Sequence, residues 1–270
     1  MNPFYDTHAH LDYPELAPEL PHIIARAHAA GVAKIIAIGT DLESSARALA
    51  ITERYPEVYA AVGWHPTHVM TAPDDIRPAL RQLARHPKAV AIGETGMDYY
   101  RLPSQTPGGT AADDAAYRAK QAIIFRQQLE VAAEMGLNCV IHQRSALDDT
   151  LAAVAEFKGR TRGVFHCFVE DPSALERVLA LDCLVSFTGI ITFKTAATIR
   201  ASAAAVPADC FMVETDSPYL APVPYRGKPG EPSYVVHTAA EIARVRQCSL
   251  AELSCATCAT AERFFPKLRG

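Results

Sequence analysis

The sequence predicts an α/β protein in which parallel strands and helices alternate, as in a closed (β/α)8 barrel of the TIM type. Three observations carry this prediction: eight short apolar runs rich in β-forming residues, longer segments with helical spacing between most of them, and 270 residues without a linker or a break in composition. Barrels of this kind often occupy about 250 residues as one domain. We therefore expect residues 1–270 to form a single domain.

The eight predicted strands are short apolar runs bounded by polar or turn-forming residues. They span residues 4–7, 34–38, 58–63, 89–93, 138–141, 163–165, 183–187 and 210–213. A doubly wound open sheet is the alternative architecture, but it usually carries a glycine-rich phosphate loop after its first strand. The sequence has no such loop there, so the barrel is preferred.

The predicted helices have ordinary start and stop signals. One spans about residues 117–135, where apolar residues recur at steps of three and four, and Gly136 follows in the position that ends a helix. An earlier helix is expected to stop at Gly31, and the last to open with a capping box at residues 249–252. Residues 102–116, rich in Pro, Gly, Ser, Thr and Asp, are expected to form an exposed loop.

Composition and charge limit the classes of function. The chain is 49% hydrophobic and 21% charged, which is typical of a soluble globular protein, and its net charge of -4 creates no general attraction for nucleic acid. Neither a membrane-spanning apolar run of about 18 residues nor a signal peptide is evident. The seven cysteines, an odd number, are expected to be free thiols in a cytoplasmic protein.

Polar residues follow six of the predicted strands. They are His8, His10, His65, Glu94, His142, His166 and Asp216. Taken singly, each has a simpler explanation, such as a backbone hydrogen bond, a buried salt bridge or, for Asp216, a helix N-cap. In a barrel, however, the carboxyl ends of the strands meet at one mouth, where such a set would suffer desolvation and like-charge repulsion unless cations were bound. The pattern therefore predicts a metal site.

The number of candidate ligands suggests two divalent ions. His8 and His10 are two residues apart on a strand, so both rings can reach one ion. Without His65, six candidates remain, which exceeds one tetrahedral ion but suffices for two ions if one carboxylate bridges them. Imidazole and carboxylate ligands together suit zinc, manganese, cobalt or iron better than an all-oxygen magnesium site.

Several motifs in this order resemble those of the TatD family of metal-dependent deoxyribonucleases, within the amidohydrolase-like barrel superfamily. They are DTHAHLD at 6–12, VGWHP at 62–66, IGETGMDY at 92–99, IHQR at 141–144, FHCF at 165–168, ETDSPYLAP at 214–222 and YRGK at 225–228. The resemblance covers nearly the whole chain.

The resemblance implies a role for each strand-end residue. One ion is assigned to His8, His10, Glu94 and Asp216, and the other to Glu94, His142 and His166, with Glu94 as the bridge. His65 is placed beside the ions, in contact with the substrate phosphate or with a neighbouring side chain. Family members are tested with magnesium and often crystallise with zinc, so the metals considered are zinc, magnesium and manganese. We also expect Asp216 to act as the general base for the attacking water.

Three basic residues are candidates for binding substrate phosphate. Arg144 follows His142 by two residues, so an extended backbone would direct both side chains into the mouth. Arg226 and Lys228 lie in the loop after the eighth strand, a region that often binds phosphate in such barrels. The alternative is that these residues are solvated rim charges, or that Arg144 pairs with a carboxylate.

The leading functional hypothesis is metal-dependent hydrolysis of phosphodiesters by a monomer that trims DNA, acting on single strands or ends. A barrel amidohydrolase acting on a small amide, lactone or ester is the first alternative. Such enzymes often bridge their ions with a carboxylated lysine on the fourth strand, where this chain has Glu94. A D-aminoacyl-tRNA deacylase and a non-catalytic binding protein are further alternatives, and the retention of six ligands argues against the latter.

Overall fold

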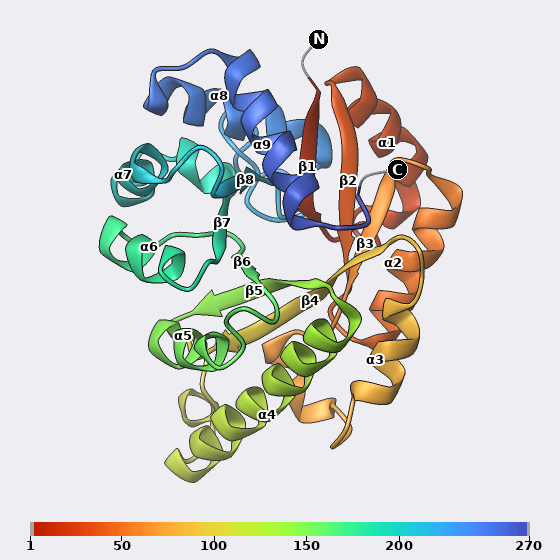
Figure 1. The fold of residues 1–270 in the computed structure, drawn as a ribbon, viewed down its shortest axis with the longest axis vertical. Helices are drawn as coiled ribbons and strands as arrows, with labels where there is room; N and C mark the ends of the chain where they lie inside the picture. Colours follow the sequence, from red (N-terminus) through yellow and green to blue (C-terminus); the bar gives the residue numbers. More distant parts are fainter. Residues whose placement is uncertain (1–2, 269–270) are drawn as a thin grey trace.

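Eight parallel strands form one sheet that curls into a barrel in the computed structural model, which describes residues 3–268 (Figure 1). Each strand pairs with the next one along the chain, in the order β1 to β8. The strands are β1 (Phe4–Ala9), β2 (Val32–Ile38), β3 (Val58–Val62), β4 (Ala89–Asp98), β5 (Asn138–Arg144), β6 (Gly163–Phe165), β7 (Leu184–Phe187) and β8 (Phe211–Val213). The predicted (β/α)8 barrel is confirmed.

The barrel closes between β1 and the segment that follows β8. The amide of His10 donates to the Ser217 carbonyl at 2.8 Å, and the amide of Asp216 donates to the His8 carbonyl at 2.9 Å. Ala9 and Ser217 form an isolated parallel bridge at the same level. The seam therefore holds predicted metal ligands from both ends of the chain.

Helices connect the strands and surround the barrel. They are α1 (Leu20–Ala29), α2 (Leu42–Arg54), α3 (Arg77–Ala84), α4 (Ala111–Met135), α5 (Leu147–Ala155), α6 (Pro172–Leu179), α7 (Ala197–Ala205), α8 (Val235–Arg246) and α9 (Leu250–Phe264). Short 3-10 turns are η1 (Ala17–Glu19), η2 (Pro66–Thr71), η3 (Pro103–Gln105), η4 (Gly189–Thr192) and η5 (Pro232–Tyr234). The expected capping box opens α9, and Gly136, in a left-handed conformation with φ of 64°, ends α4.

The predicted loop at residues 102–116 is too long. The Thr110 side chain accepts from the Asp113 amide while the Asp113 side chain accepts from the Thr110 amide, and this capping box starts α4 at Ala111. The helix expected from residue 117 therefore begins six residues earlier, and the shorter loop contains η3.

Strands β4 and β5 extend further than predicted. The predicted ends were residues 93 and 141, but the ladder continues through Gly96 opposite His142 to Asp98 opposite Arg144. Glycine and charged residues disfavour a strand assignment from sequence, and here the hydrogen-bonded partner overrides that preference. Both strands therefore continue beyond the predicted metal ligands Glu94 and His142.

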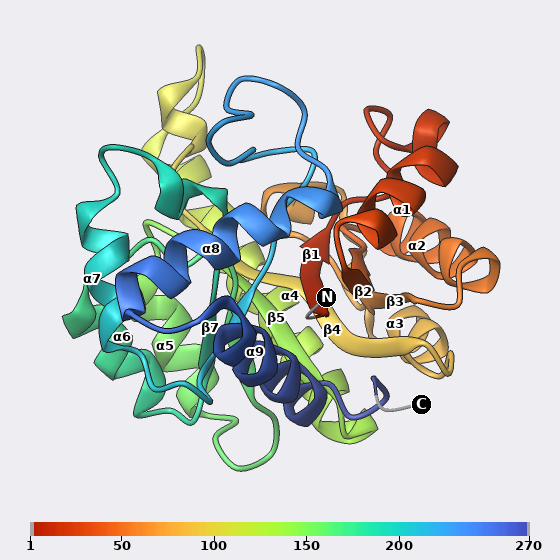
Figure 2. The same cartoon turned by 90° about the horizontal axis from the view of Figure 1, so that it is seen from above.

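An apolar layer fills the lower part of the barrel. Inward-facing residues such as Ile36, Val140 and Met212 pack against Phe264 and Phe265 at the end of α9, all at most 1% exposed. Figure 2 shows α9 across the end of the barrel opposite the long loops that follow β4 and β8. None of the described helices combines the length and apolar character needed to cross a bilayer. As predicted, all seven cysteines are free thiols.

Candidate metal centre

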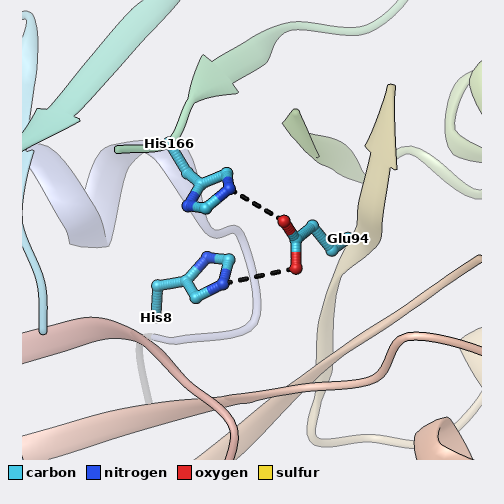
Figure 3. A group of neighbouring side chains, drawn as sticks. All are labelled: His8, Glu94 and His166. Carbon is cyan, nitrogen blue, oxygen red and sulfur yellow. Dashed lines mark ion pairs between the residues drawn. The ribbon is translucent and has the colours of Figure 1, made fainter. Parts of the chain in front are cut away.

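Glu94, in β4, lies at the centre of the predicted site. Its carboxylate is almost fully buried, and imidazole nitrogens of five histidines lie within 3.7 Å of its two oxygens. Figure 3 shows the Glu94 carboxylate facing His8 of β1 and His166, which directly follows β6, with one oxygen directed toward each ring. Every strand-end residue singled out in the sequence reaches this centre, including His65 and Asp216.

A first group of ligand atoms gathers around Oε2 of Glu94. The Nε2 atoms of His8 and His10 lie 3.5 and 3.7 Å from this oxygen and 3.4 Å from each other. Oδ1 of Asp216 completes the group, 3.5 Å from His8 and 3.3 Å from His10. These residues come from β1 and the position just after it, from β4, and from the turn after β8.

A second group surrounds Oε1 of the same carboxylate. Nε2 of His166 lies 2.8 Å away, Nδ1 of His142 lies 3.1 Å away, and Nε2 of His65 lies 3.4 Å away. The His142 and His166 nitrogens are 3.3 Å apart. Each Glu94 oxygen thus faces its own set of imidazoles.

Both groups fit divalent cations. Four ligand atoms around a tetrahedral ion with bonds of about 2.0–2.1 Å lie roughly 3.3–3.4 Å from one another. The distances within both groups, 2.8–3.7 Å, lie around this value. The rings of His8 and His166 stack at 4.0 Å between centroids, an arrangement that two protonated imidazoles would oppose. The donor set and its spacing therefore suit metal ions better than a network of charged histidines.

The electrostatics of the centre keep its carboxylates ionised. Burial opposes ionisation of Glu94, but the surrounding histidines, His65 and His166 above all, hold its pKa well below the ordinary value. The pKa of Asp216 is likewise lowered, because the hydrogen bond from His10 and the nearby imidazoles outweigh burial. Burial lowers the pKa of His65 to about 4, which leaves this ring neutral at physiological pH.

One buried acid is hydrogen-bonded to His142 and another lies beside His166, and the sequence interpretation missed both. Oδ2 of Asp98 lies 2.9 Å from Nε2 of His142, so it holds the proton on that nitrogen and leaves Nδ1 free to bind an ion. Oε1 of Glu214 lies 3.5 Å from Nδ1 of His166 and accepts from the Cys167 amide at 2.7 Å. Both acids lie within the TatD-like motifs, at residues 92–99 and 214–222, and this position is the sign of a functional role that the sequence offers.

Asp216 does not cap a helix. It lies in a turn with a φ of 58°, and the Tyr219 amide donates to its carbonyl at 2.9 Å. The preceding Thr215 is fixed by the buried Asp6, which accepts from the Thr215 amide at 2.9 Å and from its hydroxyl at 2.6 Å. Burial raises the pKa of Asp6 to about 8. The hydrogen bonds between Asp6 and Thr215 fix the turn that carries the Asp216 carboxylate.

The three predicted phosphate-binding residues lie on the rim of the mouth. The Arg144 guanidinium stacks on the Tyr100 ring, 3.5 Å from its centre, and that of Arg226 lies 4.4 Å from the centre of Phe193. Lys228 is exposed in the loop after β8. Within residues 3–268, no ion pair joins Arg144, Arg226 or Lys228 to a carboxylate, so the alternative of a paired Arg144 is not seen.

Comparison with known proteins places the chain in a family. A family model described as "TatD related DNase" matches residues 5–266. The chain is 33% identical over 262 residues to the uncharacterized metal-dependent hydrolase YabD of Bacillus subtilis, covering 97% of this chain and 98% of that protein. It is 34% identical over 264 residues to the uncharacterized metal-dependent hydrolase YcfH of Escherichia coli K12, covering 96% and 94%.

Solved structures agree with this assignment. YJJV, a TatD homolog from Escherichia coli, superimposes with a TM-score of 0.88 at 28% identity, over 97% of this chain and 98% of that one. An amidohydrolase from Burkholderia multivorans shares the barrel fold at a TM-score of 0.63 and 16% identity, over 98% and 99%. With the sequence motifs, the barrel and the ligand cluster in agreement, the chain belongs to the TatD family of metal-dependent hydrolases.

Proposed function

We propose that the protein hydrolyses phosphodiesters with two divalent ions and trims the ends of DNA strands. The observation that carries this proposal is the Glu94 carboxylate, which presents one oxygen to each group of ligand atoms. One ion is assigned to His8, His10, Glu94 and Asp216, and the other to Glu94, His142 and His166. The nitrogen-rich ligand set favours zinc or manganese over magnesium.

The attacking water needs a base beside the ions. When bound, a pair of divalent ions lowers the pKa of a water molecule and stabilises the charge that develops on the leaving oxygen. The Asp216 side chain is 13% exposed, whereas that of Glu94 is 3% exposed, so Asp216 is the carboxylate that can face an entering water molecule. We therefore assign the general base to Asp216.

His65 acts as a hydrogen-bond donor in this proposal. Its Nδ1 accepts from the Thr67 amide at 3.1 Å, which places the proton on Nε2. That N–H lies 3.4 Å from Oε1 of Glu94 at the edge of the second group. The neutral ring can therefore donate to a phosphate oxygen beside the ions, as expected from the sequence, rather than serve as a ligand.

Support for a DNA substrate comes from the family and from the rim. The matching family is described as TatD related DNase, whereas the named relatives are uncharacterized hydrolases. Arg144, Arg226 and Lys228 offer positive charge beside the mouth of a chain with a net charge of -4, and guanidinium groups bind phosphate oxygens in pairs. We propose that the enzyme acts as a monomer in the cytoplasm, an environment in which its seven free thiols stay reduced.

A substrate panel tests the proposal. Protein reconstituted with zinc, manganese or magnesium is incubated with end-labelled single- and double-stranded DNA, with RNA, with D-aminoacyl-tRNA, and with a set of amides and lactones. We expect metal-dependent shortening of single-stranded DNA from one end. Hydrolysis of only the amides or lactones would favour the amidohydrolase alternative, and release of only the amino acid would favour the deacylase.

A further inference from the structure

The segment between β4 and α4 carries groups that the proposed chemistry does not use. Tyr100 is 49% exposed although it lies beside the mouth, and the Arg144 guanidinium covers one face of its ring. The Tyr100 amide donates to Oδ1 of Asp98 at 2.9 Å, and the Tyr99 amide donates to the Arg144 carbonyl at 2.9 Å. Backbone hydrogen bonds therefore hold this stacked pair in place.

The stacked pair stands next to the second group of metal ligands. Asp98, which holds His142, is paired with Arg144 in the β4–β5 ladder. Arg144 is two residues beyond His142, so its Cα lies about 7 Å further along the strand. This distance is comparable to one nucleotide unit of an extended strand. The pair is therefore placed to contact the nucleotide adjacent to a bond cleaved at the ions.

Arg144 is one of the exposed arginines whose charge is not paired with a carboxylate in the described part of the chain. Arg126 pairs with Glu156 and Arg177 pairs with Asp148, whereas Arg144 has no carboxylate partner within residues 3–268. A guanidinium that lies flat on a ring keeps its N–H groups at the edge, where they can bind a phosphate. Arg144 thus offers charge without a neutralising neighbour.

A pocket of about 370 Å³ is formed in part by the residues that follow Tyr100 in the sequence. It is lined by Arg101, Leu102, Pro103, Gln105, Thr106 and Tyr117. Tyr117 is one helical turn before Gln121, whose side chain bonds to the Asp98 amide and carbonyl at 2.8 and 2.9 Å. The pocket is therefore attached to the same strand end as the metal ligands, and its lining combines apolar side chains with the charged Arg101.

We propose that Tyr100, Arg144 and this pocket form a binding subsite for the nucleotides that adjoin the cleaved bond. The neighbouring base stacks on the Tyr100–Arg144 pair, its phosphate contacts the Arg144 guanidinium, and the next base enters the pocket. Every base has a π-face, so such a subsite tolerates any sequence in a single strand, whether DNA or RNA. This inference rests on the proposed phosphodiester chemistry and adds the way the strand is held.

The test measures binding and hydrolysis of short single-stranded DNA and RNA. Fluorescence anisotropy in the presence of a chelator gives the affinity, and the reconstituted enzyme gives kcat/KM. Because base stacking on an aromatic ring is strong, Tyr100→Ala should weaken binding of both nucleic acids by about fivefold to 100-fold, whereas Tyr100→Phe should rescue binding. Thr106→Trp, which fills the pocket, should remove the affinity gained when a third nucleotide is added. Arg126→Ala in α4 is the control and should bind as wild type does.

An abasic nucleotide distinguishes stacking from general damage. Removing the base next to the cleaved bond should weaken wild-type binding as much as Tyr100→Ala does, and the two changes together should add little. Additive losses, or equal affinities for wild type and Tyr100→Ala, would overturn the subsite. Wild-type protein that binds the strand but cleaves no phosphodiester would instead overturn the proposed function.

Discussion

The two ends of the barrel are buried to a similar degree but have opposite chemistry. At the base, Phe264 and Phe265 are fully buried among inward-facing aliphatic side chains. At the mouth, His8 and Glu94 are 0% and 2% exposed, among other imidazoles and carboxylates. Burial of apolar surface stabilises the fold, whereas burial of ionisable groups opposes it. The base is therefore the source of stability and the mouth that of activity, and substitutions at the two ends should separate these properties.

The largest effect is expected for Glu94→Ala. Loss of the carboxylate that faces both groups should release both ions and lower turnover by roughly 10³-fold or more, because metal catalysis contributes several kcal/mol. Elemental analysis of protein purified without chelator measures the first effect and single-turnover kinetics the second. His166→Ala is the comparison, since it should weaken mainly one ion. Full metal content and activity in Glu94→Ala would refute the bridge.

Asp216→Asn should abolish most turnover while the protein stays folded. The amide cannot accept the proton of the attacking water, so we expect kcat to fall by about 10²- to 10⁴-fold. Thermal unfolding should shift by only a few degrees, because the Thr215–Asp6 contacts that hold the turn remain. Near-normal turnover in this variant would remove the assignment of Asp216 as the base.

A substitution at the base should give the opposite result. Phe265→Ala removes a fully buried ring and should lower the free energy of unfolding by about 3–5 kcal/mol. The kcat of the molecules that remain folded should stay within about twofold of wild type, because the cluster around Phe265 consists of apolar residues and includes none of the proposed metal ligands. Denaturant titration and active-site counting measure the two quantities. A fall in kcat at unchanged stability would contradict the separation of the two ends.

A smaller effect is expected from substitution of Asp98, which is hydrogen-bonded to the ligand His142 but is not itself one of the proposed metal ligands. Asp98→Ala should weaken metal affinity by about 10- to 100-fold, because the proton on Nε2 of His142 loses its acceptor. Asp98→Asn keeps an acceptor oxygen and should lose less. Competition with a chromophoric chelator reports the affinity. Equal affinities in wild type and both variants would show that Asp98 has no part in orienting His142.

The smallest effect is expected on the rim. Arg226→Ala and Lys228→Ala should each raise KM for oligonucleotides by roughly two- to fivefold, and the increase should be smaller at high salt. The metal content of both variants should be unchanged. Arg244→Ala, which removes an exposed arginine paired with Glu241 on α8, is the matched control. Oligonucleotide kinetics identical to wild type in both rim variants would exclude phosphate binding and strengthen the small-molecule alternative.

The sequence predicted the barrel and the ligand cluster because both depend on local patterns. An apolar run marks a strand, the first polar residue after the run marks the level of the barrel mouth, and the parallel topology brings these residues together. His8, Glu94 and His142 were found in this way. The N-terminal boundary of α4 was misplaced because Ala, Asp and Thr occur in loops and helices alike, and the capping box at Thr110 was not recognised.

The two buried acids beside His142 and His166 could not be predicted from spacing. Asp98 meets His142 only because β4 continues past Gly96, and that extension depends on hydrogen bonds to β5. Glu214, which directly follows β8, lies beside His166, although β8 is two places away from β6 in the sheet. A side-chain contact between distant segments leaves no periodic pattern, so only the folded structure reveals it.

The barrel closes along a seam that joins the first strand to the last quarter of the chain. During synthesis, His8 and His10 leave the ribosome long before Asp216 exists, so a nascent chain has only part of the first group of ligands. The group becomes complete when the amides of His10 and Asp216 reach the carbonyls of Ser217 and His8. Under the proposed ligand assignment, an ion bound here would join the segment after β8 to β1, and its binding free energy would add to that of the closed barrel. The same cation would then stabilise the closed barrel during folding before it takes part in hydrolysis.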